Sequence, residues 1–430
     1  MKAHSFFPDQ TKSTLYAMAG DDCSLYFDLD KLTPKQLIDH TSNIELTGLL
    51  QVANLFMGKS YDHVAMFEQF NEKPWSNMLD FYYESFENMG IQPVNKNNMQ
   101  FHPHDHFYES VIKKNSDKDF ITLYLLSGSN EVIHNNKTAL DISKAINSKM
   151  VFAEKAPHVG IPTPETLVFP KHQINSIQTE HFLKKHKDVM LKIMGLAGAR
   201  NVTSIKSIEE ARVYLAEYDE NMEVIFQEKI PTEKFTEMTV DLRISDEEIR
   251  IANVRKILFA EGLWVGNLIG SSVELTKEQE EILLQVGKYA REMGYTSPEG
   301  LNCGIDYFVN KSETLITEIN ARWTGGLFPA EMMKRLNLGK RDVVAFFDTI
   351  SIDSIQKYQE FMSEHLYPKS TAGFSNVPIG FSPFLVEIGE KNHFFIWHMI
   401  EGDLNAFQIA KREALDQHDM PTADLLSLDL

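Results

Sequence analysis

Two short apolar segments after residue 300 constrain the fold more than any other part of this sequence. Cys303 to Val309 and Thr314 to Ile319 each have the length and apolar content of a buried strand, and only Asn310 to Glu313 separate them. A connection this short joins neighbouring strands in an antiparallel hairpin. The chain is therefore expected to build a sheet around this hairpin.

The hairpin carries oxygen-bearing side chains in a pattern that suits a metal ion. Asp306 lies on the first strand, and Glu318 and Asn320 lie two residues apart on the second, so that they share one face. Pairing would bring the three together as hard ligands, which Mg²⁺ and Mn²⁺ prefer. A solvated hairpin face is the alternative. Metal binding is favoured because apolar residues flank the acids, namely Ile305, Phe308, Ile316 and Ile319.

A second pattern lies earlier in the chain, where an apolar strand ends beside a loop of small residues. Val189 to Ile193 is predicted to be a buried strand with Lys192 near its end, and the loop Gly195 to Arg200 is rich in Gly and Ala. Glycine lets backbone N–H groups approach phosphate oxygens closely, and the lysine adds a fixed cation. The pattern indicates a phosphate-binding site, with a plain turn as the alternative for the loop.

The charge of the chain argues against a nucleic-acid or membrane partner. Its 430 residues include 61 acidic and 42 basic side chains, for a formal net charge of -19. Such an excess repels the phosphates of nucleic acids and of anionic membranes. A local group of Lys and Arg residues can still bind a small anion inside one cleft. We therefore expect small-molecule substrates, no nucleic-acid partner and no membrane partner.

Cysteine content and hydropathy predict a reducing compartment. Cys23 and Cys303 are too few for a disulfide framework and lack the spacing of a zinc site. The N-terminal residues contain no apolar core of a signal peptide, and no segment reaches the ~18 uninterrupted apolar residues of a membrane span. The predicted location is the cytoplasm.

Length and element patterns predict three parts of the chain. A chain of 430 residues usually divides into two or three domains of about 100 to 200 residues. Residues 1–140 mix helical patterns with a buried strand at Phe120 to Leu126, which predicts an α/β domain. Residues 141–349 alternate helices and strands and contain both patterns described above. Residues 350–430 form a C-terminal extension with weaker periodicity.

Several short motifs follow one another between residues 148 and 330. They are Lys149, the sequence Gly160-Ile161-Pro162-Thr163-Pro164, Lys192 with its loop, Gln227 to Ile230, Asp306, and Glu318 to Arg322. In order and spacing this set resembles the ATP-grasp superfamily, of the carboxylate-amine or peptide ligase type. No single motif is specific, so the resemblance rests on the ordered set. It implies an α/β N-terminal domain followed by an α+β ATP-grasp fold, in which two halves clamp ATP, and a C-terminal extension.

The resemblance also implies roles for residues around the ATP. Lys149 and Lys192 would touch the phosphates, and the loop with Gly195 and Gly198 would close over them. This loop has fewer glycines than that of many ligases. Three residues are implied to form the hinge that meets the adenine, namely Glu228, Lys229 and Ile230.

Further residues are implied to act on the transferred phosphate. Arg322 matches an arginine that neutralises the acyl phosphate or a substrate carboxylate. Glu237 and Arg255, on strands of the same half, would face the nucleotide or the phosphate. The predicted catalytic residues are therefore Arg322, Arg255 and Lys192. The implied ligands of one or two Mg²⁺ ions, or of Mn²⁺, are Asp306, Glu318 and Asn320.

The function that the resemblance implies is an ADP-forming ligase, which activates a carboxylate as an acyl phosphate and passes it to an amine. Phosphoryl transfer needs positioning and charge neutralisation more than a protein nucleophile, which lysines, metal ions and an arginine would supply. The expected substrates are a small carboxylate and a small amine, such as amino acids or peptides. Two alternatives stay open, a phosphoryl transferase acting on a hydroxyl group and a nucleotide-binding regulatory protein without turnover. A homo-oligomer is compatible with the sequence.

Three other signals are weaker. His102-Pro103-His104-Asp105-His106 offers transition-metal ligands, but Pro103 interrupts regular spacing and a polar surface loop is favoured. Cys303 is a candidate nucleophile, although its place on an apolar strand favours a packed side chain. Trp323-Thr324-Gly325-Gly326 follows the metal strand where many ATP-grasp members have Pro, Arg or Ser, so it leaves the acceptor unassigned.

Overall fold

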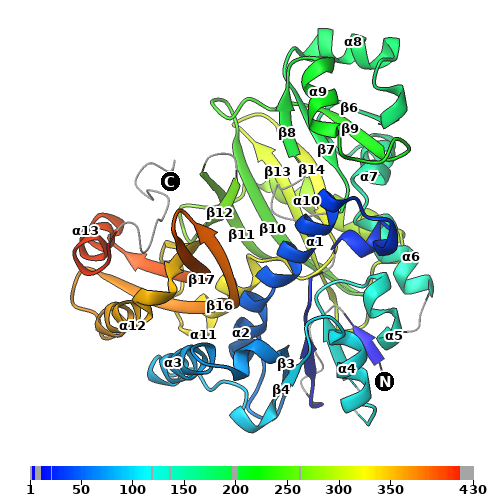
Figure 1. Ribbon diagram of the computed structural model, residues 1–430. Helices are drawn as coiled ribbons and strands as arrows, with labels where there is room; N and C mark the ends of the chain where they lie inside the picture. The colour runs from blue at the N-terminus through cyan, green and yellow to red at the C-terminus, as the bar shows by residue number, and fades with distance from the viewer. Residues whose placement is uncertain are drawn as a thin grey trace.

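The computed structural model describes residues 2–4, 11–20, 22–117, 120–134, 137–195, 202–260 and 263–416 (Figure 1). Its strands form three sheets, of five, four and eight strands. In this described part of the chain, no helix is long and apolar enough to cross a lipid bilayer.

The N-terminal part of the chain forms the five-stranded sheet, in which all neighbouring strands are parallel. Parallel strands require crossover connections, which helices provide here. The predicted strand at Phe120 to Leu126 is present and ends at Leu123. The strands, in sheet order, are β1 (Lys2–His4), β5 (Phe120–Leu123), β2 (Leu15–Ala17), β3 (His63–Phe67) and β4 (Met99–His102). The helices are α1 (Pro34–Leu46), α2 (Gly48–Met57), α3 (Trp75–Asn88), α4 (Phe107–Lys114), α5 (Glu131–His134) and α6 (Lys137–Ile146).

A smaller antiparallel sheet follows, at the top of Figure 1. Its central strand Val189–Ile193 is apolar apart from Lys192, as the sequence predicted. Ser207 caps the following helix by accepting a hydrogen bond from the Glu210 N–H. The strands, in sheet order, are β6 (Thr166–Pro170), β9 (Glu223–Glu228), β7 (Val189–Ile193) and β8 (Val202–Ile205), and the helices are α8 (Ile177–His186) and α9 (Ile208–Leu215).

The eight-stranded sheet crosses the middle of the molecule and is antiparallel throughout. It contains the predicted hairpin, and it continues into strands of the predicted C-terminal extension. The order is β14 (Thr314–Asn320), β13 (Leu301–Val309), β10 (Thr236–Ile244), β11 (Ile249–Ala260), β12 (Leu263–Ile269), β15 (Val343–Ser351), β17 (Lys391–Gly402) and β16 (Phe374–Ile388). The associated helices are α7 (Lys149–Lys155), α10 (Lys277–Glu292), α11 (Leu327–Arg335), α12 (Ile355–Glu364) and α13 (Leu404–Ala414).

The buried apolar side chains of the described residues form two separate hydrophobic cores. One contains side chains of both the N-terminal sheet and the eight-stranded sheet, including Phe67 and Trp397. The other belongs to the four-stranded sheet and includes Leu191 and Phe226. Phe27, from the N-terminal part, packs against this second core. The four-stranded sheet is therefore a separate body that faces the larger one.

Most element predictions for the middle of the chain agree with the structure. Helix α7 begins at Lys149 and continues as a 3₁₀ turn to Val159, where Gly160 ends it with a left-handed φ of 74°. The segment Trp264 to Gly270, which had no strand prediction, forms most of β12. Its strand character escaped the sequence pattern because Gly266 and Asn267 interrupt the apolar run.

Candidate active site

The hairpin of β13 and β14 brings the three predicted metal ligands together. Asp306 stands opposite Glu318 in the register of the strands. The Asn320 Nδ2 atom donates hydrogen bonds to Asp306 Oδ2 at 2.9 Å and to Glu318 Oε1 at 3.2 Å. Rotation of this amide by 180° would direct its oxygen, in place of its nitrogen, toward the Asp306 and Glu318 carboxylates. The convergence expected from the sequence is therefore present.

Two lysines from other elements lie beside these acids. Lys149, the first residue of α7, forms an ion pair of 2.7 Å between its Nζ and Glu318 Oε2. Lys192, on β7 of the four-stranded sheet, is only 9% exposed. Burial lowers the pKa of Lys192, and the carboxylates of Glu318, Glu237 and Asp306 oppose that shift. The site therefore lies between the two antiparallel sheets.

Burial and mutual repulsion perturb the acids of this site. Burial and the Asp306 carboxylate raise the pKa of Glu237 to about 8. Burial and Glu318 raise the pKa of Asp306 to about 7. Burial acts on Glu318 as well, but Lys149 and Lys192 outweigh it and hold the pKa of Glu318 well below its ordinary range. Three carboxylates thus surround two ammonium groups.

The donor set fits a hard divalent cation that is shared with another ligand. Two carboxylates and an amide oxygen suit Mg²⁺, which commonly completes its shell with phosphate oxygens and water. Throughout the described residues, no three His, Cys, Asp or Glu side chains are arranged to hold a metal ion.

Arg322 connects the metal strand with the N-terminal sheet. Its Nη1 donates to Asn320 Oδ1 at 2.5 Å, and its Nε donates to Tyr124 Oη at 2.9 Å. The guanidinium also lies over the Tyr124 ring, 5.6 Å from the ring centroid. Tyr124 directly follows β5, at the carboxyl edge where open parallel sheets bind ligands. Arg322 thus contacts both the strand with the predicted metal ligands and the carboxyl edge of the N-terminal sheet.

Asn147 holds the backbone between Asn320 and Arg322. Its Oδ1 accepts a hydrogen bond from the Ala321 N–H at 2.8 Å, and its Nδ2 donates to the Ala321 carbonyl at 3.3 Å. The next residue, Ser148, caps α7. Residues 147–149 therefore dock α7 onto the end of β14 by a side-chain clamp, a helix cap and an ion pair.

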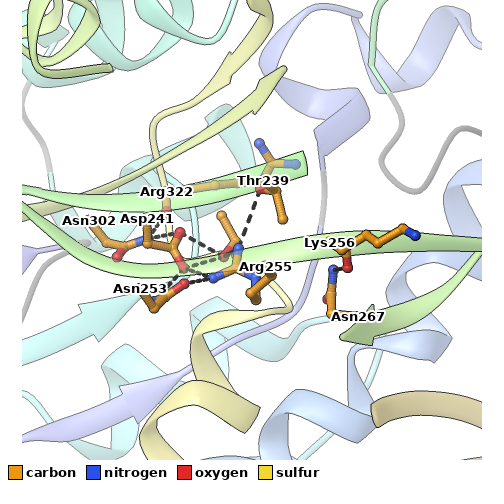
Figure 2. A network of polar contacts seen from close by, with 9 residues as sticks. Thr239, Asp241, Asn253, Arg255, Lys256, Asn267, Asn302 and Arg322 are labelled. Carbon is orange, nitrogen blue, oxygen red and sulfur yellow. Dashed lines mark hydrogen bonds and ion pairs between the residues drawn. The ribbon is translucent and has the colours of Figure 1, made fainter. Parts of the chain in front are cut away.

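Arg255, the third predicted catalytic residue, lies in a buried polar network (Figure 2). Its side chain is 1% exposed, and its Nη1 donates to Asp241 Oδ2 at 2.6 Å and to Asn253 Oδ1. Its Nη2 lies 3.4 Å from both Thr239 Oγ1 and Thr324 Oγ1. Both terminal nitrogens of Arg255 therefore donate hydrogen bonds to side chains of the protein.

Two glycines of the turn after β14 approach this network closely. A Cβ atom on Gly326 would overlap Arg255 Nε, and a Cβ atom on Gly325 would lie 2.6 Å from the Trp264 ring. A larger residue at Gly326 would have to displace the buried Arg255 side chain, and one at Gly325 would have to displace Trp264. The Gly-Gly pair that distinguishes this sequence is thus explained by close packing of the turn over Arg255.

The predicted phosphate loop lies mostly outside the described residues. Gly195 follows β7 with a φ of 102°, which favours glycine. Gly198 falls in residues 196–201, which the description does not include. Of the predicted loop glycines, only Gly195 therefore has a described position, directly after the strand that carries Lys192.

The predicted hinge residues lie where β9 leaves the four-stranded sheet. Glu228 Oε2 accepts a hydrogen bond from the Glu165 N–H at 3.3 Å. Lys229 Nζ donates to Asp188 Oδ2 at 3.0 Å. Ile230 is buried. Hydrogen bonds or burial therefore hold each of these three side chains in place. The chain then continues into β10, which contains Glu237.

The weaker sequence signals have packing explanations. His102 is buried with its Nδ1 2.9 Å from Ser110 Oγ, and burial lowers its pKa to about 4. The His104 ring packs edge-on against Phe67, with 5.2 Å between ring centroids. Cys303 is fully buried, which raises the pKa of its thiol. Such a thiol is kept in its unreactive protonated form.

Comparison with known proteins agrees with the motif order. Residues 146–326 match the model of the ATP-grasp domain family. This range contains every predicted site residue and runs from just before α7 to the turn after β14. No curated protein matches the chain significantly. The resemblance predicted from the ordered motifs is confirmed.

Solved structures extend the likeness to nearly the whole chain. Carboxyaminoimidazole ribonucleotide synthase from Aspergillus clavatus, complexed with ATP, is similar with a TM-score of 0.55 at 11% identity, over 95% of this chain and 98% of that chain. Phosphoribosylamine–glycine ligase from Thermotoga maritima is similar with a TM-score of 0.53 at 13% identity, over 93% and 95%. N5-carboxyaminoimidazole synthetase from Staphylococcus aureus, complexed with ADP, gives 0.53 at 9% identity, over 93% and 96%. The predicted fold class, an N-terminal α/β part with an ATP-grasp fold, is confirmed.

Four residues around the site had no functional prediction from the sequence. Tyr124 and Asn147 reach it from distant parts of the chain, and no local pattern marks them. Thr239 and Asp241 did leave a signal, since they alternate with Met238, Val240 and Leu242 along one strand. Polar residues at every second position of an apolar strand indicate a face with polar contacts.

Proposed function

Because residues 146–326 form an ATP-grasp domain, we propose that this chain is an ADP-forming ligase that joins a small carboxylate to a small amine. The observation that carries the proposal is the grouping of Lys149, Lys192, Asp306, Glu318 and Asn320 between two antiparallel sheets. Cations and hard oxygen ligands in one buried site suit the phosphates of MgATP.

Residues of both sheets would bind the nucleotide. Lys192 and Lys149 would contact phosphate oxygens, and Gly195 begins the loop on the same side. The segment Glu228 to Ile230 would border the base, and Glu237 would lie at the inner end of the site. A divalent cation held by Asp306, Glu318 and Asn320 would supply charge neutralisation for the phosphates.

The proposed reaction has two steps. A substrate carboxylate oxygen attacks the γ-phosphorus, the bond to the β-phosphate oxygen breaks, and ADP leaves. The amine nitrogen then attacks the carbonyl carbon of the acyl phosphate, phosphate leaves, and the nitrogen loses a proton. Arg322 would hold the carboxylate or the transferred phosphate, because its guanidinium fork matches either anion.

The contacts of Arg322 support a binding position for the carboxylate substrate. Arg322 bonds to Asn320 on the metal strand and to Tyr124 at the carboxyl edge of the parallel sheet. A small carboxylate at that edge would face the phosphates across Arg322. The N-terminal part would then contribute to substrate binding as well as to packing.

The deciding experiment traps the activated carboxylate with hydroxylamine. Purified protein is incubated with MgATP, hydroxylamine and pools of carboxylates, including amino acids and peptides, and ADP and hydroxamate are both measured. A ligase of this type forms them in equal amounts in the presence of one carboxylate. The matched control is the Lys192→Ala variant, which should form neither at the wild-type rate.

The two other functions predict different products. A phosphoryl transferase would release ADP and phosphorylate a hydroxyl group without forming hydroxamate. A regulatory protein would bind ATP and release no ADP with any pool. Either result would replace the ligase proposal.

A further inference from the structure

Asp241 is the centre of the buried network beside the candidate site (Figure 2). It lies on β10, is 0% exposed, and accepts hydrogen bonds from two neighbouring strands and from the turn after β14. The donors are Arg255 Nη1 at 2.6 Å, Asn253 Nδ2 at 3.0 Å, Asn302 Nδ2 at 3.1 Å and Thr324 Oγ1 at 2.8 Å.

The network reaches the metal ligands through Thr239. Arg255 Nη2 donates to Thr239 Oγ1 at 3.4 Å. Thr239 stands opposite both Arg255 and Asp306 in the strand registers, so its side chain lies beside theirs on one face of the sheet. Asp241, Arg255, Thr239 and Asp306 therefore form a continuous chain of side chains across three strands.

A second connection reaches Arg322. The Asn302 Nδ2 atom donates both to Asp241 Oδ1 and to the Arg322 carbonyl, at 3.1 and 2.8 Å. Thr324, two residues further along, bonds to both Asp241 oxygens. The turn that carries Arg322 is thus attached to Asp241 at two points.

We propose that the Asp241–Arg255 pair is a positioning device, which fixes Asp306 through Thr239 and the Arg322 backbone through Asn302. The inference rests on the proposed function, since it assigns a task within that site. It also changes the role of Arg255, which acts through Thr239 and not by contact with a phosphate. Partners of metal ligands commonly matter 10–100-fold for metal affinity or activity, about the effect expected here.

A matched ion pair joins β15, three strands away from β10 in the same sheet, to helix α13. Lys411 Nζ lies 3.1 Å from Asp348 Oδ2, and their side chains are 6% and 1% exposed. A buried ion pair is often no more stabilising than neutral residues of the same volume. Replacing each pair by neutral polar residues should therefore perturb stability similarly, and only the Asp241–Arg255 replacement should disturb the site.

The experiment compares Asp241→Asn/Arg255→Gln with Asp348→Asn/Lys411→Gln. ATP binding is measured by calorimetry over a series of Mg²⁺ concentrations, and unfolding is measured by thermal denaturation. We expect the first double variant to need about 10-fold more Mg²⁺ for half-maximal ATP binding, with a shift in Tm similar to that of the second. The second should bind ATP like the wild type.

A single variant covers the case in which the first double variant does not fold. Thr239→Val removes only the hydroxyl that accepts from Arg255 beside Asp306, and it should also raise the Mg²⁺ requirement. Wild-type Mg²⁺ dependence in Thr239→Val, or in a folded Asp241→Asn/Arg255→Gln protein, would overturn the positioning role alone. Failure of the wild-type protein to bind MgATP would overturn the proposed function, and this inference with it.

Discussion

Two buried ion pairs lie at opposite halves of the eight-stranded sheet, one between two strands and one between a strand and helix α13, and their surroundings differ. Arg255 and Asp241 on β11 and β10 are joined by 2.6 Å, and Lys411 and Asp348 on α13 and β15 by 3.1 Å. Both pairs have side chains at most 6% exposed. By burial and distance alone, the two pairs could not be told apart.

The difference lies in what each pair touches. The Asp241 pair continues through Thr239 to a site where three carboxylates meet two lysines. The Asp348 pair has Tyr358, His398 and the cation Arg412 as neighbours, and burial lowers the pKa of His398 to about 3, so that ring stays uncharged. Buried charge that is balanced locally stabilises packing, whereas buried charge that adjoins an excess of acids indicates a binding site for a cation.

The largest effect should come from breaking the C-terminal pair. Lys411→Met removes the countercharge of the buried Asp348 carboxylate, so the free energy of unfolding should fall by about 3–5 kcal/mol. Chemical denaturation measures this loss. Turnover per folded molecule should not change. The control is Lys334→Met, which removes an ion pair with a 79% exposed lysine and should cost at most about 1 kcal/mol. Slower turnover by folded Lys411→Met protein would show that the Asp348–Lys411 pair also affects the active site. The proposed difference between the two ion pairs would then be wrong.

For Glu318, in the half of the sheet that carries the candidate site, we expect a loss of turnover without a comparable loss of stability. Glu318→Ala deletes one predicted metal ligand. Displacement of the phosphate by about 1 Å can lower kcat ~100-fold. Stability should change little in comparison. ADP formation at saturating Mg²⁺ measures the effect, and Glu313→Ala, in the exposed turn of the same hairpin, is the control. Near wild-type turnover would remove Glu318 from the ligand set.

A third test concerns the cation that the four-stranded sheet contributes. Lys192→Ala should weaken ATP binding and turnover together, because the ammonium would already contact phosphate in the ground state. Loss of a hydrogen bond to a charged group corresponds to about 10-fold or more in affinity. Calorimetric titration with ATP measures it, and the control is Lys185→Ala, at an exposed lysine of the neighbouring helix α8. Unchanged affinity would move Lys192 out of the nucleotide site.

The smallest effect is expected from a change that keeps the charge. Arg322→Lys retains a cation but loses the guanidinium fork that now reaches both Asn320 and Tyr124. We expect kcat to fall about 10-fold, the value of one charge-assisted hydrogen bond, while ATP affinity stays near that of the wild type. Steady-state kinetics and ATP titration separate the two quantities. A loss confined to ATP affinity would show that Arg322 is not used in the chemical step.

The sequence predicted the parts of the site that follow from local pattern. Alternation along β14 placed Glu318 and Asn320 on one face, and the short turn fixed the hairpin with Asp306. Lys192 was predicted because it lies near the end of an apolar strand beside a loop of small residues. These predictions needed only the periodicity of a strand and the length of a turn.

Other parts required contacts that no local pattern contains. Asn147 reaches Ala321 across 174 residues, and Tyr124 reaches Arg322 across 198. The pairing of β15 with β12 joins the C-terminal strands to the same sheet, although the sequence shows only that apolar strands are available there. Sheet order and side-chain partners of this kind depend on the packing of the whole chain.

The separate core of the four-stranded sheet has a consequence for the lifetime of the assembled site. A body with its own core can open as a cooperative unit at a lower free energy than global unfolding, which hydrogen exchange would detect. Lys192 belongs to that body, while Asp306 and Glu318 belong to the other. Each opening would move Lys192 away from the carboxylates. The fraction of time in which the site is complete would then depend on the free energy of opening of the less stable of the two bodies. Exchange protection of the amides of β7 and β9 would therefore report how often the molecule is ready to bind its nucleotide.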